Sequence, residues 1–306
     1  MKRIALALVF TLGVASGAFA HNGIFDFIPT VPDPNLMTID GNDDDWGWIE
    51  ADFIVTPDEI YDSHGQHKGG GADPAPEDFS VMIMYAWSPP PDNSIYLFSR
   101  GFDDTLRAGE SEVKRNWWND DTLQFDMDMD HTGGPMSWVS TEETRNGYRI
   151  NMHPLFDEQL GGTISIDYQE PGFEDWGALP PYAYTATTVL PKDATHMSAN
   201  IEFTYEMRVA NPMVTYDILG PDVSTPHIFE ADQVIHLKTT WHDGDAEANG
   251  QQSIWTRDPD EWSAANGDFM YDYQVIATVD LDDYPEVGTS VESATWGRIK
   301  SHINQH

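Results

Sequence analysis

Short apolar runs, each about the length of a β-strand, recur along the chain and are separated by turns rich in Gly, Pro, Asn and Asp. The clearest alternation of apolar and polar positions lies at residues 123–130. Since successive side chains of a strand point to opposite faces, this pattern predicts a strand with one apolar and one polar face. The apolar face would hold Leu123, Phe125, Met127 and Met129, and the polar face Gln124, Asp126, Asp128 and Asp130.

Other runs enriched in Val, Ile, Tyr, Phe and Thr predict further strands. They lie at residues 79–87, 94–102, 148–152, 163–168, 183–189, 200–209, 234–241 and 271–279. Three intervening segments, 57–78, 170–181 and 243–268, contain the turn residues typical of long loops. A short helix is expected near the C-terminus, within 290–306. The predicted fold is an all-β antiparallel sandwich with long loops and a short C-terminal helix.

The first residues have the pattern of a secretory signal. Two basic residues precede an apolar run, and the sequence AFA at 18–20 is typical of a cleavage site. We therefore expect a signal peptide at 1–20, an extended segment at 21–37, the sandwich domain at 38–285 and a tail or short helix at 286–306. No later apolar stretch approaches the length of a membrane span. The protein is expected to be exported, to an extracellular or periplasmic location, without a transmembrane segment.

The charge balance limits the partners of the protein. The chain has 52 acidic and 15 basic residues and a net charge of −37, which argues against nucleic acid, because phosphate binding depends on clustered Lys and Arg. Its hydrophobic (40%) and aromatic (12%) content is enough for a folded core, so global disorder is excluded. Cysteine is absent, so stability must come from the core, bound ions or assembly.

Four segments together resemble the family-9 carbohydrate-binding module. They are IDGNDDDW at residues 39–46; VMIMYAW at 81–87 with IYLF at 95–98 and two aspartates at 103–104; WNDDTLQFD at 118–126; and WHDGDAE at 241–247 with QSIW at 252–255. The resemblance implies a β-sandwich that binds sugars, and relatives of this sandwich hold structural calcium or bind haem.

Two groups of acidic residues are candidate calcium ligands. Asp243, Asp245 and Glu247 offer oxygens at alternate positions of one loop, a pattern that suits calcium. Asp126, Asp128 and Asp130 would repel one another on one strand face unless a cation, or Arg145 or Arg149 from the next strand, lies between them. A solvated acidic turn and a solvated outer face are the alternatives. A third acidic run, at residues 43–45, fits a capped turn before Trp46.

Tryptophans near predicted loops could stack on sugar rings. The candidates are Trp87, Trp117, Trp118 and Trp255, and Trp176 is a further one. Trp117 and Trp118 are adjacent, so on a strand one of them must point away from the core. Core packing is the alternative for each.

Two redox sites are lesser alternatives. Haem could be bound by Met82, Met84, His153 or Met213. Copper could be bound by an N-terminal His21 together with His64, His67 or His242. No nucleophile elbow, zinc-protease motif or phosphate-binding loop occurs in the sequence, and we expect no enzymatic activity.

The leading hypothesis is an exported, non-catalytic protein that binds glycan through loop aromatics, with calcium stabilising the acidic loop. The alternative is a structural protein that assembles with itself into an extracellular layer or filament. In that case the proline-rich segment at 28–34 would add a strand to the sheet edge of a neighbour.

Overall fold

The computed structural model describes residues 24–63, 76–108, 117–133, 147–155, 163–166, 172–173, 176–217, 219–245, 253–257 and 270–277. The secondary structure of these ranges consists of strands and short 3-10 helices, which confirms the all-β prediction. The 3-10 helices are η1 Pro34–Leu36, η2 Ala51–Phe53, η3 Pro57–Glu59, η4 Trp117–Asn119, η6 Trp176–Ala178 and η7 Pro221–Val223. No helix in the described ranges has the length and hydropathy needed to cross a membrane.

The larger of two main sheets has nine strands. These are β1 Phe25–Pro29, β3 Tyr61–Asp62, β6 Thr122–Asp128, β7 Tyr148–His153, β8 Thr163–Ile166, β9 Gly172–Phe173, β14 Val234–Asp243, β15 Ser253–Thr256 and β16 Tyr271–Ile276. Seven follow the order β1-β16-β14-β6-β7-β8-β9, while β15 pairs with β14, and β3 with β15. The pairing is antiparallel throughout, except that β1 runs parallel to β16.

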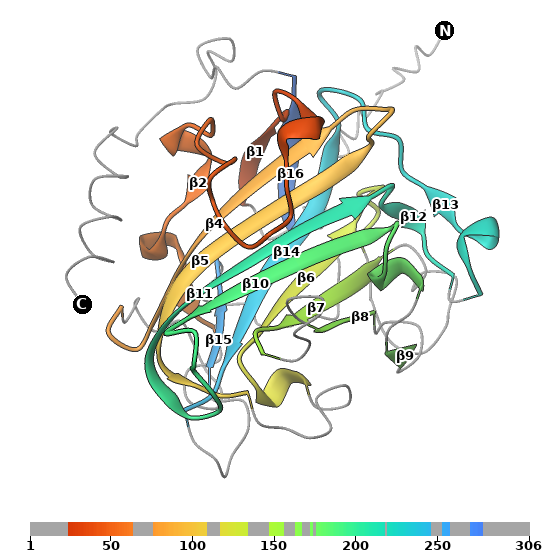
Figure 1. The fold of residues 1–306 in the computed structure, drawn as a ribbon. Helices are drawn as coiled ribbons and strands as arrows, with labels where there is room; N and C mark the ends of the chain where they lie inside the picture. Colours follow the sequence, from red (N-terminus) through yellow and green to blue (C-terminus); the bar gives the residue numbers. More distant parts are fainter. Residues whose placement is uncertain are drawn as a thin grey trace, which may run out of the picture.

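The second main sheet has five strands in the order β10-β11-β5-β4-β2. Their bounds are β2 Ile54–Val55, β4 Phe79–Ser88, β5 Ser94–Leu106, β10 Ala183–Leu190 and β11 Ser198–Ala210. A separate two-stranded ribbon pairs β12 Met213–Thr215 with β13 Thr225–Pro226. The long strands of the five-stranded sheet lie across β14, β6 and β7 of the larger sheet, as expected for a sandwich (Figure 1).

The main core lies between the two sheets. Strand β6 contributes the apolar face expected from its alternation, with Leu123, Phe125 and Met127 buried, and Met129 continues it just after the strand. Strand β4 contributes Val81, Ile83 and Tyr85 from the opposite sheet, and β14 contributes Ile235, Leu237 and Trp241. This burial supplies the apolar contact that holds the two layers together.

The outer face of β4 and β5 is also buried. Residues 31–54 pack across it, so that Trp46 and Phe53 join Met82, Met84 and Phe98 in a second core. Because β4 is buried on both faces, its residues 81–87 form a continuous apolar run. The fold thus explains why residues 79–88 lack the alternation of β6.

Every strand predicted from the sequence is present, with ends that shift by a few residues. The short strands β2, β3, β9, β12, β13 and β15 were not predicted, and three of these, β3, β9 and β15, lie in segments predicted to be loops. Strand β1 lies in the segment predicted to be an extended arm, and its pairing with β16 makes that segment part of the sandwich. The predicted signal peptide at 1–20 and C-terminal helix lie outside the described residues.

Candidate functional site

The polar face of β6 is buried in the structure, and the expectation of a solvated outer face is wrong. Asp126 is fully buried and accepts a hydrogen bond from Arg149 Nε at 2.8 Å. The two residues are directly opposed across β6 and β7, which confirms the predicted cross-strand pair. Arg145, the other predicted partner, lies outside the described residues.

Asp128 and Asp130, the other two carboxylates predicted on this face, have partners different from that of Asp126. Asp128 Oδ2 contacts His236 Nδ1 at 3.1 Å and accepts the backbone N–H of Gly133 at 2.8 Å. Asp130 accepts the Thr132 hydroxyl at 2.7 Å. Burial raises the pKa of Asp128, but its hydrogen bonds outweigh that effect and hold the pKa below its ordinary value. The structure therefore separates Asp126, which pairs with Arg149, from Asp128 and Asp130, whose side chains remain in contact.

The predicted acidic loop contributes to a carboxylate cluster that draws on four segments. Asp243 ends β14 and lies with Asp103 of β5 and Asp121, which precedes β6. All three side chains are buried, and one carboxylate oxygen of each lies within 4.8 Å of the others. A second group is formed by Asp78, Asp104 and Asp245, which are half-buried. One carboxylate oxygen of each again lies within 4.8 Å of the others. We refer to these six residues as the acidic cluster.

Backbone and indole N–H groups hold the buried half of the acidic cluster in place. Asp121 accepts the backbone N–H groups of Arg107 and Gly244, the latter at 3.0 Å. Asp243 Oδ2 accepts the indole N–H of Trp255 at 2.8 Å. Gly244 lies between Asp243 and Asp245, the two predicted loop ligands. Its hydrogen bond to Asp121 therefore connects the turn that carries them to the residue just before β6.

Four buried carboxylate oxygens of the acidic cluster accept no hydrogen bond from the described residues. They are Asp103 Oδ2, Asp104 Oδ1, Asp243 Oδ1 and Asp245 Oδ1. An unpaired buried carboxylate is costly, so such groups either take up protons or bind a cation. The donor set is entirely oxygen, which suits calcium.

The pKa values of the acidic cluster reflect this unbalanced charge. Burial raises the pKa of Asp103 to about 8, and it also raises that of Asp245, to about 7. Burial is again the largest cause for Asp121 and Asp243, and charge repulsion from Asp103 raises the pKa of both further. Without a cation, the cluster therefore holds protons near neutral pH.

Sequence reasoning found two members of the acidic cluster and missed four. Glu247, the third predicted loop ligand, lies outside the described residues. Asp103 and Asp104 form a pair within β5, and Asp121 follows another acidic residue directly before β6. Such pairs of adjacent aspartates, within or next to a predicted strand, could have indicated these residues as candidate ligands. The identity of the partners depended on which strands meet, and a sequence pattern does not specify that.

The predicted tryptophans fall into two classes. Trp87 and Trp255 are each 2% exposed, so they are core residues and their predicted role in stacking on a ligand is wrong. Trp87 donates its indole N–H to the carbonyl of Ile276, and Trp255 stacks on Phe79 at 5.4 Å. Trp176, the further candidate, stacks on Tyr216 at 4.8 Å and donates to the carbonyl of Asp217.

Trp118 is 37% exposed, and among the described side chains it is the only exposed tryptophan. It lies in η4, where the chain turns as a 3-10 helix, so the argument from strand alternation does not apply to it. The side chain of Trp117 lies outside the described part. Helix η4 leads directly into Asp120 and Asp121, which places Trp118 three residues from the acidic cluster along the chain.

The residues considered for haem have structural contacts. Met82 and Met84 fill the second core, and Met213 is buried in the main core. His153 lies 3.1 Å from a carboxylate oxygen of Asp120. Of the copper candidates, His21, His64 and His67 lie outside the described residues, and the Nε2 of His242 lies 3.0 Å from Gln124 Oε1.

No known family profile matches the sequence, and no curated protein matches it. Solved structures do. A family-9 carbohydrate-binding module from Caldicellulosiruptor kristjanssonii in complex with cellotriose matches with a TM-score of 0.53 and 12% identity, over 88% of this chain and all of the other. A family-9 module from the same organism in complex with glucose matches with a TM-score of 0.51 and 12% identity, over 83% of this chain and 95% of the other.

The chain has a fold like that of family-9 carbohydrate-binding modules. Within this fold, the IDG…W segment that carried the resemblance has a clear structural role. The backbone N–H groups of Asp40 and Gly41 and the indole N–H of Trp46 all donate to the buried carboxylate of Glu206, at 2.7–2.8 Å.

Gly41 is required in this segment for two reasons. It has a φ of +82°, and a Cβ there would lie 2.9 Å from Thr188 Cγ2. Any other residue would strain the backbone and collide with β10. The segment thus ties the covering layer of the family-9-like sandwich to β11.

Proposed function

We propose that this protein is an exported, non-catalytic carbohydrate-binding protein. The family-9-like fold supports the class of ligand, since the matched structures contain cellotriose and glucose. The observation that carries the proposal is Trp118, an exposed indole on a short, well-anchored turn. A flat aromatic side chain fixed by the backbone beside polar groups is the usual platform for the apolar face of a sugar ring.

The position of Trp118 also gives it a rigid support. Asp120 and Asp121, which follow η4, are both buried and bonded to side chains or backbone of other segments. A platform held in this way loses little conformational entropy when a ligand binds.

Trp118→Ala tests this function. We expect cellotriose to bind the full chain in isothermal titration calorimetry and the variant to bind at least about tenfold more weakly, a change of about 1.4 kcal/mol. Leu219→Ala is a matched control, because Leu219 is an exposed apolar side chain in another segment, just before η7. It should leave the affinity unchanged.

Unchanged affinity in Trp118→Ala would contradict the assignment of the site. No binding to any glucose oligomer, together with ordered polymers in electron micrographs, would favour the self-assembling structural protein instead. The pairing of β1 with β16 within one chain argues against that alternative, because it occupies the strand expected to reach a neighbour.

We further propose that calcium binds the acidic cluster and fixes the turn after β14. Six carboxylates gather there, four of their buried oxygens accept no hydrogen bond from the described residues, and all the donors are oxygen. The ligands from the buried half of the acidic cluster would be Asp103, Asp121 and Asp243. Those from the half nearer to solvent would be Asp78, Asp104 and Asp245. Calcium supplies the positive charge that these carboxylates need in order to remain ionised.

A further inference from the structure

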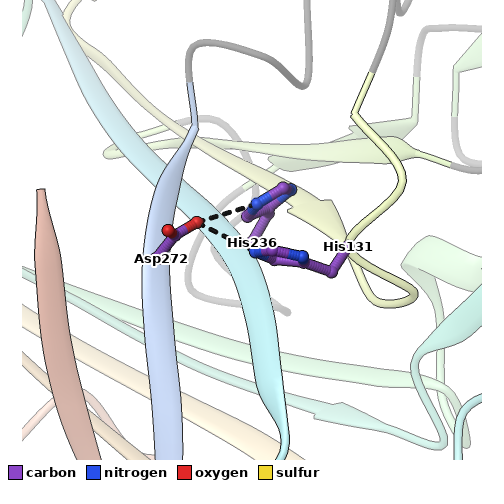
Figure 2. A group of neighbouring side chains, drawn as sticks. All are labelled: His131, His236 and Asp272. Carbon is purple, nitrogen blue, oxygen red and sulfur yellow. Dashed lines mark hydrogen bonds and ion pairs between the residues drawn. The ribbon is translucent and has the colours of Figure 1, made fainter. Parts of the chain in front are cut away.

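A second group of potential metal ligands lies on the larger sheet, apart from the acidic cluster. It consists of His131, His236 and Asp272, which come from the turn after β6, from β14 and from β16 (Figure 2). The Nε2 atom of His131 lies 3.0 Å from Asp272 Oδ1, and the Nε2 atom of His236 lies 2.9 Å from the same oxygen. The two imidazole rings are 3.8 Å apart between centroids.

The contacts of His236 leave one of its ring nitrogens in an unfavourable position. A carboxylate oxygen lies near each nitrogen, from Asp128 at Nδ1 and from Asp272 at Nε2. A neutral imidazole carries one proton, so one nitrogen would direct its lone pair at a carboxylate. A cation at Nε2 removes this conflict, because Nδ1–H then donates to Asp128 while Nε2 and Asp272 share the ion.

The pair of Asp128 and His236 also has the arrangement found behind metal-binding histidines. Such a histidine usually donates its second N–H to a carboxylate, which fixes the ring and makes it a better ligand. Asp128 is itself fixed by the backbone N–H of Gly133, in the same turn as His131. One turn therefore positions both a ligand and the support of a second ligand.

The donor set and spacing select the class of ion. Two imidazole nitrogens and one carboxylate oxygen suit zinc and similar divalent transition metals, whereas calcium prefers oxygen alone. Ligand atoms that lie about 2.0–2.2 Å from one tetrahedral metal are separated from each other by about 3.4 Å, so the 2.9 and 3.0 Å contacts of Asp272 would widen by about 0.5 Å to admit the ion. A metal ion can reach the site from solvent on the side of His131, whose side chain is 32% exposed. The His236 side chain forms the buried side of the site.

We propose that His131, His236 and Asp272 form a binding site for a divalent transition-metal ion such as Zn²⁺, with a further coordination position open toward solvent. The site would join the turn after β6 to β14 and β16. It is independent of the proposed glycan and calcium sites, because it shares no residue with them.

Zinc titration of the full chain, without a histidine tag and with calcium present to occupy the acidic cluster, tests the proposal. We expect the wild-type protein to bind one Zn²⁺ with micromolar or tighter affinity and to melt at a higher temperature when zinc is bound. His131→Ala should weaken zinc binding at least about tenfold. The variant should fold, because His131 is partly exposed.

His196→Ala is the matched control, since His196 is an exposed histidine on a turn outside the site. It should bind zinc as the wild type does. Asp272→Asn gives a second variant with a smaller change in shape, and it should also weaken binding. Absence of zinc binding, or equal affinity in His131→Ala and His196→Ala, would overturn the proposal.

Discussion

At the scale of single residues, Glu206 shows how a buried charge can organise a covering segment. Its carboxylate accepts three N–H groups from residues 40–46, and the hydroxyl of Thr204 on the same strand bonds the carbonyl of Gly41. Burial nevertheless dominates and raises the pKa of Glu206 to about 7, from an ordinary 4.5. The anchor of the second core is therefore sensitive to pH near neutrality.

Glu206→Gln should change the pH dependence of stability. In the wild type, folded Glu206 keeps the proton that it has lost in the unfolded state, so its contribution to the free energy of unfolding falls as pH rises from about 4.5 to about 7 and is level above that. The variant has no such proton. The difference in unfolding free energy between wild type and variant, measured by urea denaturation, should decline across this window.

Glu202→Gln provides the comparison, because Glu202 lies on the same strand and is only half-buried. A decline of the same size in Glu202→Gln would show that the effect does not come from the buried carboxylate of Glu206. A flat difference for Glu206→Gln would mean that the carboxylate has the same pKa in the folded and unfolded states.

At the scale of elements, β1 matters more than its short length suggests. Its pairing with β16 is the only parallel one between the described strands, and its Ile28 side chain is fully buried in the main core. Beyond its end, Val31 donates its N–H to the carbonyl of Trp87 on the other sheet. The strand thus helps to close one edge of the sandwich.

Ile28→Ala should therefore destabilise the whole fold. Removal of a buried aliphatic side chain of this size costs about 2–5 kcal/mol. Phe25→Ala in the same strand removes a side chain that is 51% exposed, and it should cost no more than about 0.5 kcal/mol. Urea denaturation of both variants measures the difference, and equal costs would show that β1 contributes little to the core.

At the scale of the whole molecule, a net charge of −37 has two components that respond differently to ions. Exposed carboxylates repel one another at the surface, where salt screens them. The buried members of the acidic cluster are shielded from salt and need a cation within the cluster. Calcium removal separates the two components.

We expect a chelator to lower the melting temperature and calcium to restore it, since an ion bound only by the folded state stabilises that state. Sodium chloride at about 1 M, where the screening length is about 3 Å, should restore only part of the loss.

Asp243→Asn should abolish the calcium response and raise the melting temperature of the calcium-free protein, because an amide relieves the repulsion with Asp103 and Asp121. Asp222→Asn, at an exposed position, should preserve the response. Full recovery in sodium chloride would contradict a specific calcium site.

The layered fold and the principal strands could be predicted from the sequence, because alternation and turn residues are local signals. Asp126 and Arg149 could be paired because neighbouring strands in the sequence are neighbours in the sheet. The burial of Trp87 and Trp255 could not be predicted in the same way, since it depends on which distant segments pack against them. Likewise, Asp103 meets Asp243 only because the ends of two sheets coincide in space.

The contact between the first strand and the last one sets the order of events during synthesis. The hydroxyl of Thr30, just after β1, donates to the carbonyl of Ile276 at the end of β16, across 246 residues of chain. At roughly 5–20 residues per second, the ribosome takes about 10–50 s to make that interval. For that time β1 has no sheet partner and exposes an edge that can pair wrongly. A chain exported before it folds would avoid this waiting period, because both strands would reach the far side of the membrane unfolded.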